Sequence, residues 1–132
     1  NVDTYIYSTW MYPKIEVKER DLSEQNLVEK NLIESGVSES SILILVGQAF
    51  DKFKLKYPKY NLLSEDNKHQ NANGTYLAAC VMFSTLSNQS SIGLSNRYYG
   101  EDSNGKKIYY TLIDSSVAKK CQEISDSIVF NR

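Results

Sequence analysis

The sequence predicts an α/β protein built on a parallel sheet. Two segments with strand character, residues 4–10 and 42–47, are each followed by a helical pattern. The run 42-ILILVG-47 has no polar alternation, which is typical of a strand covered on both faces of a parallel sheet. Strands that alternate with helices indicate helical crossovers between parallel neighbours. At 132 residues the chain has room for one ordinary domain, so we expect a single domain over residues 1–132.

The first half of the chain supplies two strands and two helices. Residues 4-TYIYSTW-10 are aromatic and β-branched and predict a strand. From Asp21, apolar residues recur at helical spacing as far as Gly36, a C-cap residue. After the second strand, residues 48–60 predict a short helix that Pro58 ends.

The second half begins with a polar loop and continues with two helices. Asn73 is predicted to cap a helix that runs to about Leu86. Gly74 in its first turn either permits a close backbone approach or only eases the entry into the helix, and we favour the second interpretation. Ser115 or Ser116 is predicted to cap a last amphipathic helix over residues 117–129.

Between these helices, residues 87–110 are rich in Ser, Asn and Gly. Asn104-Gly105 is a tight-turn signal, so we interpret the segment as an extended excursion that can include a hairpin. The pair Tyr109-Tyr110 fits an edge strand with one ring on each face, although such pairs also stack on sugars or partner proteins.

Two predicted strands are too few for a complete α/β domain. A parallel sheet of two strands would have two exposed edges and little core. We therefore expect this chain to be half of a larger α/β domain, with the other half as its partner.

Composition excludes several classes of partner. Fifteen basic and sixteen acidic residues give a formal net charge of −1, and no segment gathers the basic residues into a stripe for phosphates. We expect no nucleic-acid partner. The longest apolar runs are far shorter than the roughly 20 residues that a membrane span needs. One histidine and two separated cysteines make no zinc set, so neither a metal nor another cofactor is expected.

The cysteines and two glycosylation acceptor patterns bear on the compartment. Cys80 and Cys121 could form one disulfide, but Cys80 lies in an apolar helical stretch where a buried thiol is at least as common. Asn73 and Asn88 each begin an Asn-x-Ser/Thr pattern. These features slightly favour an extracytoplasmic protein and leave the compartment open.

The only histidine follows an aspartate by three positions in the polar loop. In Asp66-Asn67-Lys68-His69 the carboxylate can accept a hydrogen bond from one ring nitrogen and leave the other free. An imidazole held in this way is the general base that a serine nucleophile requires. Short motifs have many chance matches, so on this spacing alone a surface histidine beside an unrelated aspartate is the more common case.

The residues around Asp66 and His69 favour the catalytic interpretation more than their spacing alone does. The segment DNKHQNANGTYLAACVMF resembles the C-terminal catalytic block of the SGNH hydrolases, the GDSL-type esterase and lipase superfamily. The upstream strand ending in Trp10 and the segment ILILVGQAF resemble the elements that precede that block, so the resemblance covers residues 4–90. It implies a flavodoxin-like three-layer α/β/α fold with a parallel sheet, of which this chain is the C-terminal half. It also implies that His69 and Asp66 are the base and the orienting acid of a Ser-His-Asp triad.

The chain departs from the family pattern in what it lacks. In the family the nucleophilic serine and the oxyanion-hole residues lie upstream of this block. In this chain, the serines of the matching region lack the glycine-flanked turn that a nucleophile needs; these are Ser8, Ser41 and Ser64. No G-x-N-D motif for the oxyanion hole occurs. Gln70 also replaces the proline that follows the histidine in many relatives. The chain alone is therefore expected to be inactive, because it lacks the groups that carry most of the rate.

Two hypotheses follow, because the histidine and aspartate of the triad are present and the nucleophile and oxyanion motifs are absent. The first is the C-terminal portion of an SGNH-type serine esterase for carbohydrate or lipid esters, completed by an N-terminal half from the same gene or another chain. The alternative is a non-catalytic binding or structural subunit on a degenerate version of the fold, in which His69 is an ordinary loop residue.

Overall fold

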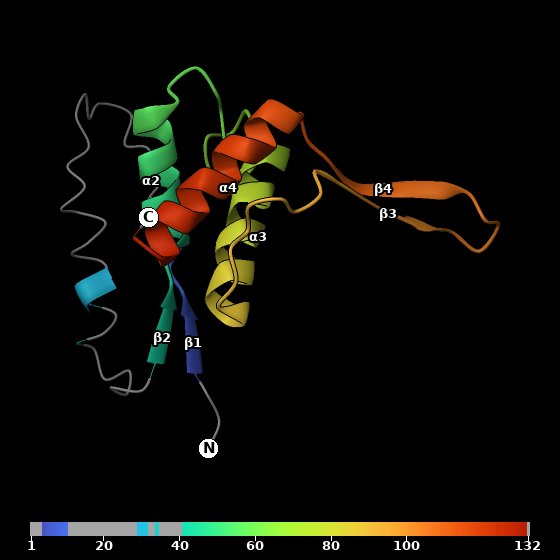
Figure 1. Cartoon of the computed structure of the whole chain (residues 1–132). Helices are drawn as coiled ribbons and strands as arrows, with labels where there is room; N and C mark the ends of the chain where they lie inside the picture. The colour runs from blue at the N-terminus through green and yellow to red at the C-terminus, as the bar shows by residue number, and fades with distance from the viewer. Residues whose placement is uncertain (1–3, 11–28, 32–33, 35–40, 132) are drawn as a thin grey trace.

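The computed structural model describes residues 4–10, 29–31, 34 and 41–131. These residues form a mixed α/β structure in which a helical body carries a parallel strand pair at one end and a projecting hairpin at another (Figure 1). Most of the helix predicted between Asp21 and Gly36 lies outside the described residues, although residues 29–31 are helical.

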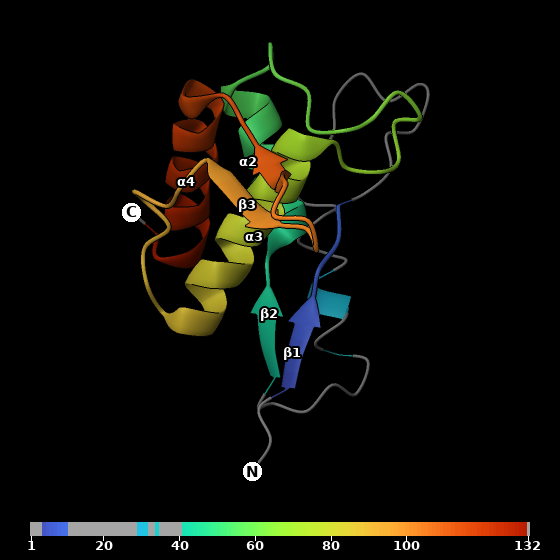
Figure 2. The same ribbon diagram turned by 90° about the vertical axis from the view of Figure 1, so that its right-hand side faces the viewer.

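The two predicted strands pair in parallel, as expected. Strand β1 (Thr4–Tyr7) lies beside β2 (Ser41–Ile44) in the register Thr4↔Ser41 to Tyr7↔Ile44 (Figure 2). The run predicted as a strand to residue 47 ends earlier, because Val46 and Gly47 already belong to helix α2 (Val46–Lys56). We expected both faces of this strand to be buried, but among the described residues Ile42 of β2 is 43% exposed.

Three helices enclose the core. Helix α3 (Ala72–Ser87) and helix α4 (Ser115–Val129) pack against each other and against α2, and the end of β2 and the buried pair Leu62-Leu63 complete the cluster. Cys80 and Cys121 are both buried and both free thiols, which answers the open question of their pairing. Burial raises the pKa of each thiol to about 12.

The helix caps differ from those predicted. Asn71, not Asn73, is the N-cap of α3, and its side-chain oxygen accepts a hydrogen bond from Gly74 N at 3.1 Å. Asp114, not one of the following serines, caps α4 by accepting hydrogen bonds from Ser116 N and Val117 N. In both places the effective cap is the residue whose extended backbone brings its oxygen over the first turn.

The excursion between α3 and α4 contains an antiparallel hairpin. Strands β3 (Arg97–Glu101) and β4 (Lys107–Leu112) join through a tight turn in which Asp102 Oδ1 accepts hydrogen bonds from Asn104 N and Lys106 N. Gly105 occupies the left-handed region with φ of +76°, where glycine has no steric cost. The turn predicted at Asn104-Gly105 is therefore confirmed.

The structure agrees with the predicted architecture only in its broad class. The described residues form one parallel strand pair and one separate antiparallel pair, so the α/β class is confirmed at that level. None of the helices in the described ranges is long and apolar enough to cross a membrane.

Candidate functional site

Asp66 and His69 are in contact within the loop between α2 and α3. His69 Nδ1 lies 2.5 Å from Asp66 Oδ2. The other carboxylate oxygen, Oδ1, accepts hydrogen bonds from Lys68 N at 2.9 Å and His69 N at 3.0 Å. One carboxylate therefore folds the loop around itself and orients the imidazole.

These contacts fix the charge of the aspartate. The hydrogen bond from His69, followed by those from the two backbone N–H groups, lowers the pKa of Asp66 to about 2. The group is a carboxylate at neutral pH, so it can hold the proton of the ring on Nδ1. The side chain of His69 is 80% exposed. The predicted contact is present, and the catalytic role of the pair stays a prediction.

Short backbone bonds hold the loop closed. Leu63 and Gln70 form an antiparallel bridge, and Ser64 N donates a hydrogen bond to His69 O at 2.8 Å. Asn67 at the tip adopts a positive φ of 54°, which asparagine tolerates better than most residues. Because Leu63 is buried in the core, the loop that carries His69 stands on a rigid base.

Trp10 connects this loop to the end of the parallel pair. Its ring stacks on Phe50 at a centroid distance of 4.7 Å, and its Nε1 donates a hydrogen bond to Lys68 O at 3.0 Å. A tryptophan at the end of a strand can either pack in the core or line a ligand crevice, and core packing is the more common case. Here the ring packs against the core and also supports the loop from the strand end.

Gly74 permits a close approach of α3 to the chain before the loop. A Cβ atom on this residue would lie 2.2 Å from Leu62 O and 2.9 Å from Gln70 Cβ. The interpretation favoured from the sequence, that Gly74 only eases entry into the helix, is therefore wrong. The contact requires glycine because any side chain would displace backbone on the loop that presents His69.

Sequence reasoning missed a buried polar cluster at the end of β1. Ser8 is 1% exposed and donates a hydrogen bond from Oγ to Glu29 Oε1 at 2.8 Å, and Gln48 Nε2 also bonds to Glu29. Glu29 lies seven positions after Leu22 and four before Ile33, so the helical spacing puts it on the apolar face of the predicted helix, a signal of burial that was not used. No local pattern indicated that Ser8 would be its partner. Because Ser8 is enclosed and bonded to a carboxylate, it is unsuited to act as a nucleophile.

Other features of the described residues do not extend this site. They contain no group of three histidine, cysteine or acidic residues that could hold a metal ion. An open hollow of about 540 Å³ lies between α2 and α4, and neither Asp66 nor His69 lines it; its residues are Lys56, Ser90, Ile92, Glu123, Asp126 and Ser127.

A scan of protein-family models, a search of curated proteins and a search of solved structures found no match to this chain.

Proposed function

We propose that this chain is the C-terminal portion of an SGNH-type serine esterase with a flavodoxin-like three-layer fold, acting on carbohydrate or small lipid esters. The observation that carries the proposal is the 2.5 Å contact between Asp66 Oδ2 and His69 Nδ1 on an exposed ring. The likeness of residues 4–90 to that superfamily supplies the reaction class.

The geometry supports a division of roles within the pair. With Asp66 ionised and the ring proton held on Nδ1, the lone pair on Nε2 is available to accept a proton from a serine hydroxyl. Asp66 then stabilises the imidazolium as it forms. The ring later returns the proton to the leaving alkoxide. In this proposal the N-terminal half that completes the domain supplies the nucleophile and the oxyanion donors.

The unfinished sheet supports the need for such a segment. Within the described residues, β1 and β2 form a sheet of two strands, so each leaves one edge unpaired. Tyr5, Tyr7 and Ile42 on these strands are between 38% and 43% exposed. A parallel sheet normally has further strands and helices over both faces, and an added N-terminal half would provide them.

The test compares three variants of the full-length protein with a chromogenic acetyl ester. His69→Ala removes the base. In Asp66→Asn the side-chain oxygen can still accept the two backbone hydrogen bonds, but the amide NH₂ group faces Nδ1 and holds the imidazole in the wrong tautomer. Each is expected to lower turnover by about 10³-fold or more. Glu65→Gln, which changes the neighbouring exposed carboxylate, is the matched control and should retain turnover. Unchanged turnover in His69→Ala would remove the pair from the mechanism.

The alternative, a non-catalytic binding or structural subunit, has one observation in its favour. Among the described residues, Asp66 is the only side chain with a hydrogen bond to the imidazole, and no hydroxyl contacts it. A fluorophosphonate probe separates the two hypotheses, because an activated serine in the full-length protein is labelled and the label is lost in His69→Ala. Absence of labelling in the wild-type protein would favour the subunit.

A further inference from the structure

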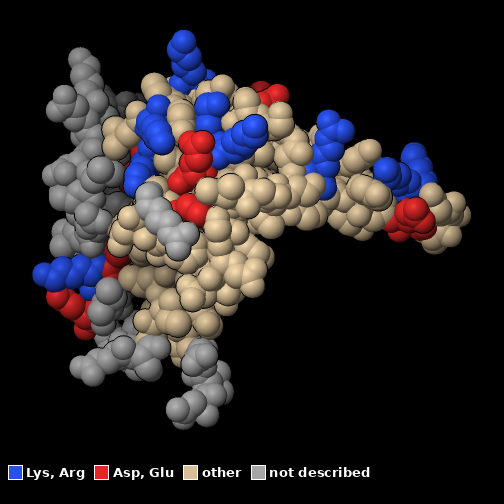
Figure 3. All heavy atoms as spheres, in the orientation of Figure 1, with Lys and Arg blue, Asp and Glu red and all other residues tan. Residues whose placement is uncertain are grey.

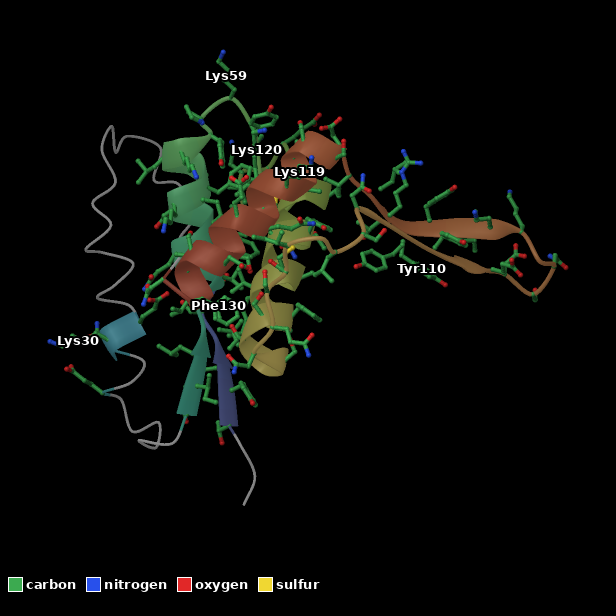
Figure 4. The ribbon with its side chains drawn as sticks, viewed as in Figure 1. Lys30, Lys59, Tyr110, Lys119, Lys120 and Phe130 are labelled. Atoms are coloured by element: carbon green, nitrogen blue, oxygen red, sulfur yellow. The ribbon has the colours of Figure 1, made fainter. Side chains whose placement is uncertain are left out.

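The β3–β4 hairpin, residues 97–112, forms an arm that stands away from the helical body (Figures 1 and 3). A two-stranded hairpin is marginally stable alone in water. This arm nevertheless exposes most of its large side chains, and Tyr110 is 71% exposed (Figure 4). The others that are more than 40% exposed are Tyr98, Tyr99, Ile108, Tyr109 and Leu112. Such an arm is stabilised if further strands extend it.

The two edges of the arm differ. On β4 a bulge leaves Tyr110 without a partner, because Tyr98 pairs with Thr111 and Tyr99 pairs with Tyr109. The ring of Tyr110 lies over Gly100, where a Cβ atom would be 2.5 Å from its hydroxyl oxygen. Bulges disturb strand pairing at sheet edges. The regular edge of the arm is therefore β3.

Alternate residues of β3 direct their backbone groups to that free edge. Asp102, the residue after β3, donates its N–H across the hairpin to Lys106 O at 2.9 Å. Hydrogen-bonded positions alternate along an antiparallel strand. Counting back from Asp102, the residues that point their N–H and C=O groups away from β4 are Arg97, Tyr99 and Glu101.

These three residues are self-complementary. Arg97 and Glu101 lie two positions before and after Tyr99, and all three side chains share one face of the strand. If a second β3 pairs antiparallel across a twofold axis at Tyr99, Arg97 of each copy faces Glu101 of the other. Neither Arg97 nor Glu101 forms a salt bridge with another described residue. Lys107, the cross-strand neighbour of Glu101, places its Nζ 3.7 Å from the ring centroid of Tyr99 instead. Charge and register match a second copy of this chain, and Tyr99 and Glu101 direct their backbone groups toward it.

We propose that two copies of this chain associate through β3 to form a four-stranded antiparallel sheet in the order β4-β3-β3-β4, with Tyr99 at the twofold axis. The interface is isologous, since each copy contributes the same strand to it. On the opposite face, this register places Tyr98 of one copy beside Gly100 of the other and the Tyr110 ring that covers it. The extension converts a marginal hairpin into a sheet of four strands.

One local contact competes with this pairing. Ser95 Oγ donates a hydrogen bond to Arg97 O at 2.7 Å and accepts one from Arg97 N at 3.1 Å. The serine hydroxyl thus occupies one of the three outward positions in the monomer, and rotation of its side chain releases the groups. Ser95→Ala is accordingly expected to tighten the association.

The experiment measures the dimerisation constant of the full-length protein by sedimentation equilibrium from low to several hundred micromolar. Arg97→Glu and Glu101→Arg each bring like charges together in two symmetric pairs, and each should weaken dimerisation by about tenfold. The double variant R97E/E101R restores opposite charges and should recover the wild-type constant. Lys106→Glu in the turn is the matched charge reversal that leaves the constant unchanged.

Each outcome decides the proposal. A wild-type protein that stays monomeric throughout the concentration range overturns it, as does a dimer that both single reversals leave intact. Failure of the double variant to recover association, with an unchanged far-ultraviolet circular dichroism spectrum, overturns the register. The substituted residues are all exposed and lie on the arm or, for Ser95, just before it, so the substitutions remove no contact of the helical core.

Discussion

Gly74→Ala gives the sharpest test of how the structure positions the His69 loop. In most helix interiors this change is stabilising by roughly 0.5–1 kcal/mol, because glycine loses more conformational entropy than alanine on folding. At this position the added Cβ atom would be 2.2 Å from Leu62 O, whereas ordinary contacts begin at 3.4 Å. The two segments must therefore separate by about 1 Å, which exceeds the slack of a packed interior.

The displaced atom also carries a hydrogen bond. Leu62 O accepts from Asn71 N at 2.9 Å, and this bond joins the chain before the loop to the start of α3. Overpacking of this kind costs about 1–3 kcal/mol. An approach of 2.2 Å to a backbone oxygen puts the cost in the upper part of this range, about 2–3 kcal/mol. After subtraction of the helix-propensity gain, we expect the free energy of unfolding to fall by about 1–2 kcal/mol.

Urea denaturation followed by far-ultraviolet circular dichroism measures this change. Thr75→Ala, one position further along the same turn and exposed, is the matched control and should shift stability by no more than about 0.5 kcal/mol. A Gly74→Ala protein as stable as the wild type, or more stable, would refute the close approach and restore the interpretation of Gly74 as an aid to helix entry.

Two further predictions concern the same loop and helix. Asn71→Ala removes the observed cap of α3 and should lower stability by about 1–2 kcal/mol, whereas Asn73→Ala should cost a few tenths; equal losses in urea denaturation would contradict the assignment. The pKa of Asp66 is depressed to about 2 from its ordinary 3.8, so its stabilising contribution is complete above about pH 4 and is lost as the pH falls through 2. A carboxyl carbon titration by NMR checks this, and a midpoint near 4, or no upward shift of the midpoint in His69→Ala, would show that the ring does not stabilise the carboxylate.

Local features of the site were predictable from the sequence. Asp66 and His69 are three residues apart, and such a short separation brings the two side chains together without help from the rest of the fold. The turn at Asn104-Gly105 is equally local, because a positive φ at one glycine decides its geometry. In both cases the nearby residues contain the whole explanation.

The mispredicted features depend on neighbours that are distant in sequence. Val46 and Gly47 continue an apolar run, and periodicity alone does not separate the end of a buried strand from the start of a buried helix. The need for glycine at position 74 arises from Leu62 O, and the burial of Glu29 arises from Ser8. No window of sequence contains both members of either pair at a regular spacing.

The contact of Trp10 with Lys68 O gives the loop a natural optical reporter. Trp10 is the sole tryptophan in the chain, so all indole emission originates at the junction between the first strand and the residue before His69. Any event that lifts the loop breaks the indole hydrogen bond and unstacks the ring from Phe50, which changes the emission maximum and the quenching by iodide. Movements of the imidazole can therefore be followed in solution without a label, on the timescale of stopped-flow mixing.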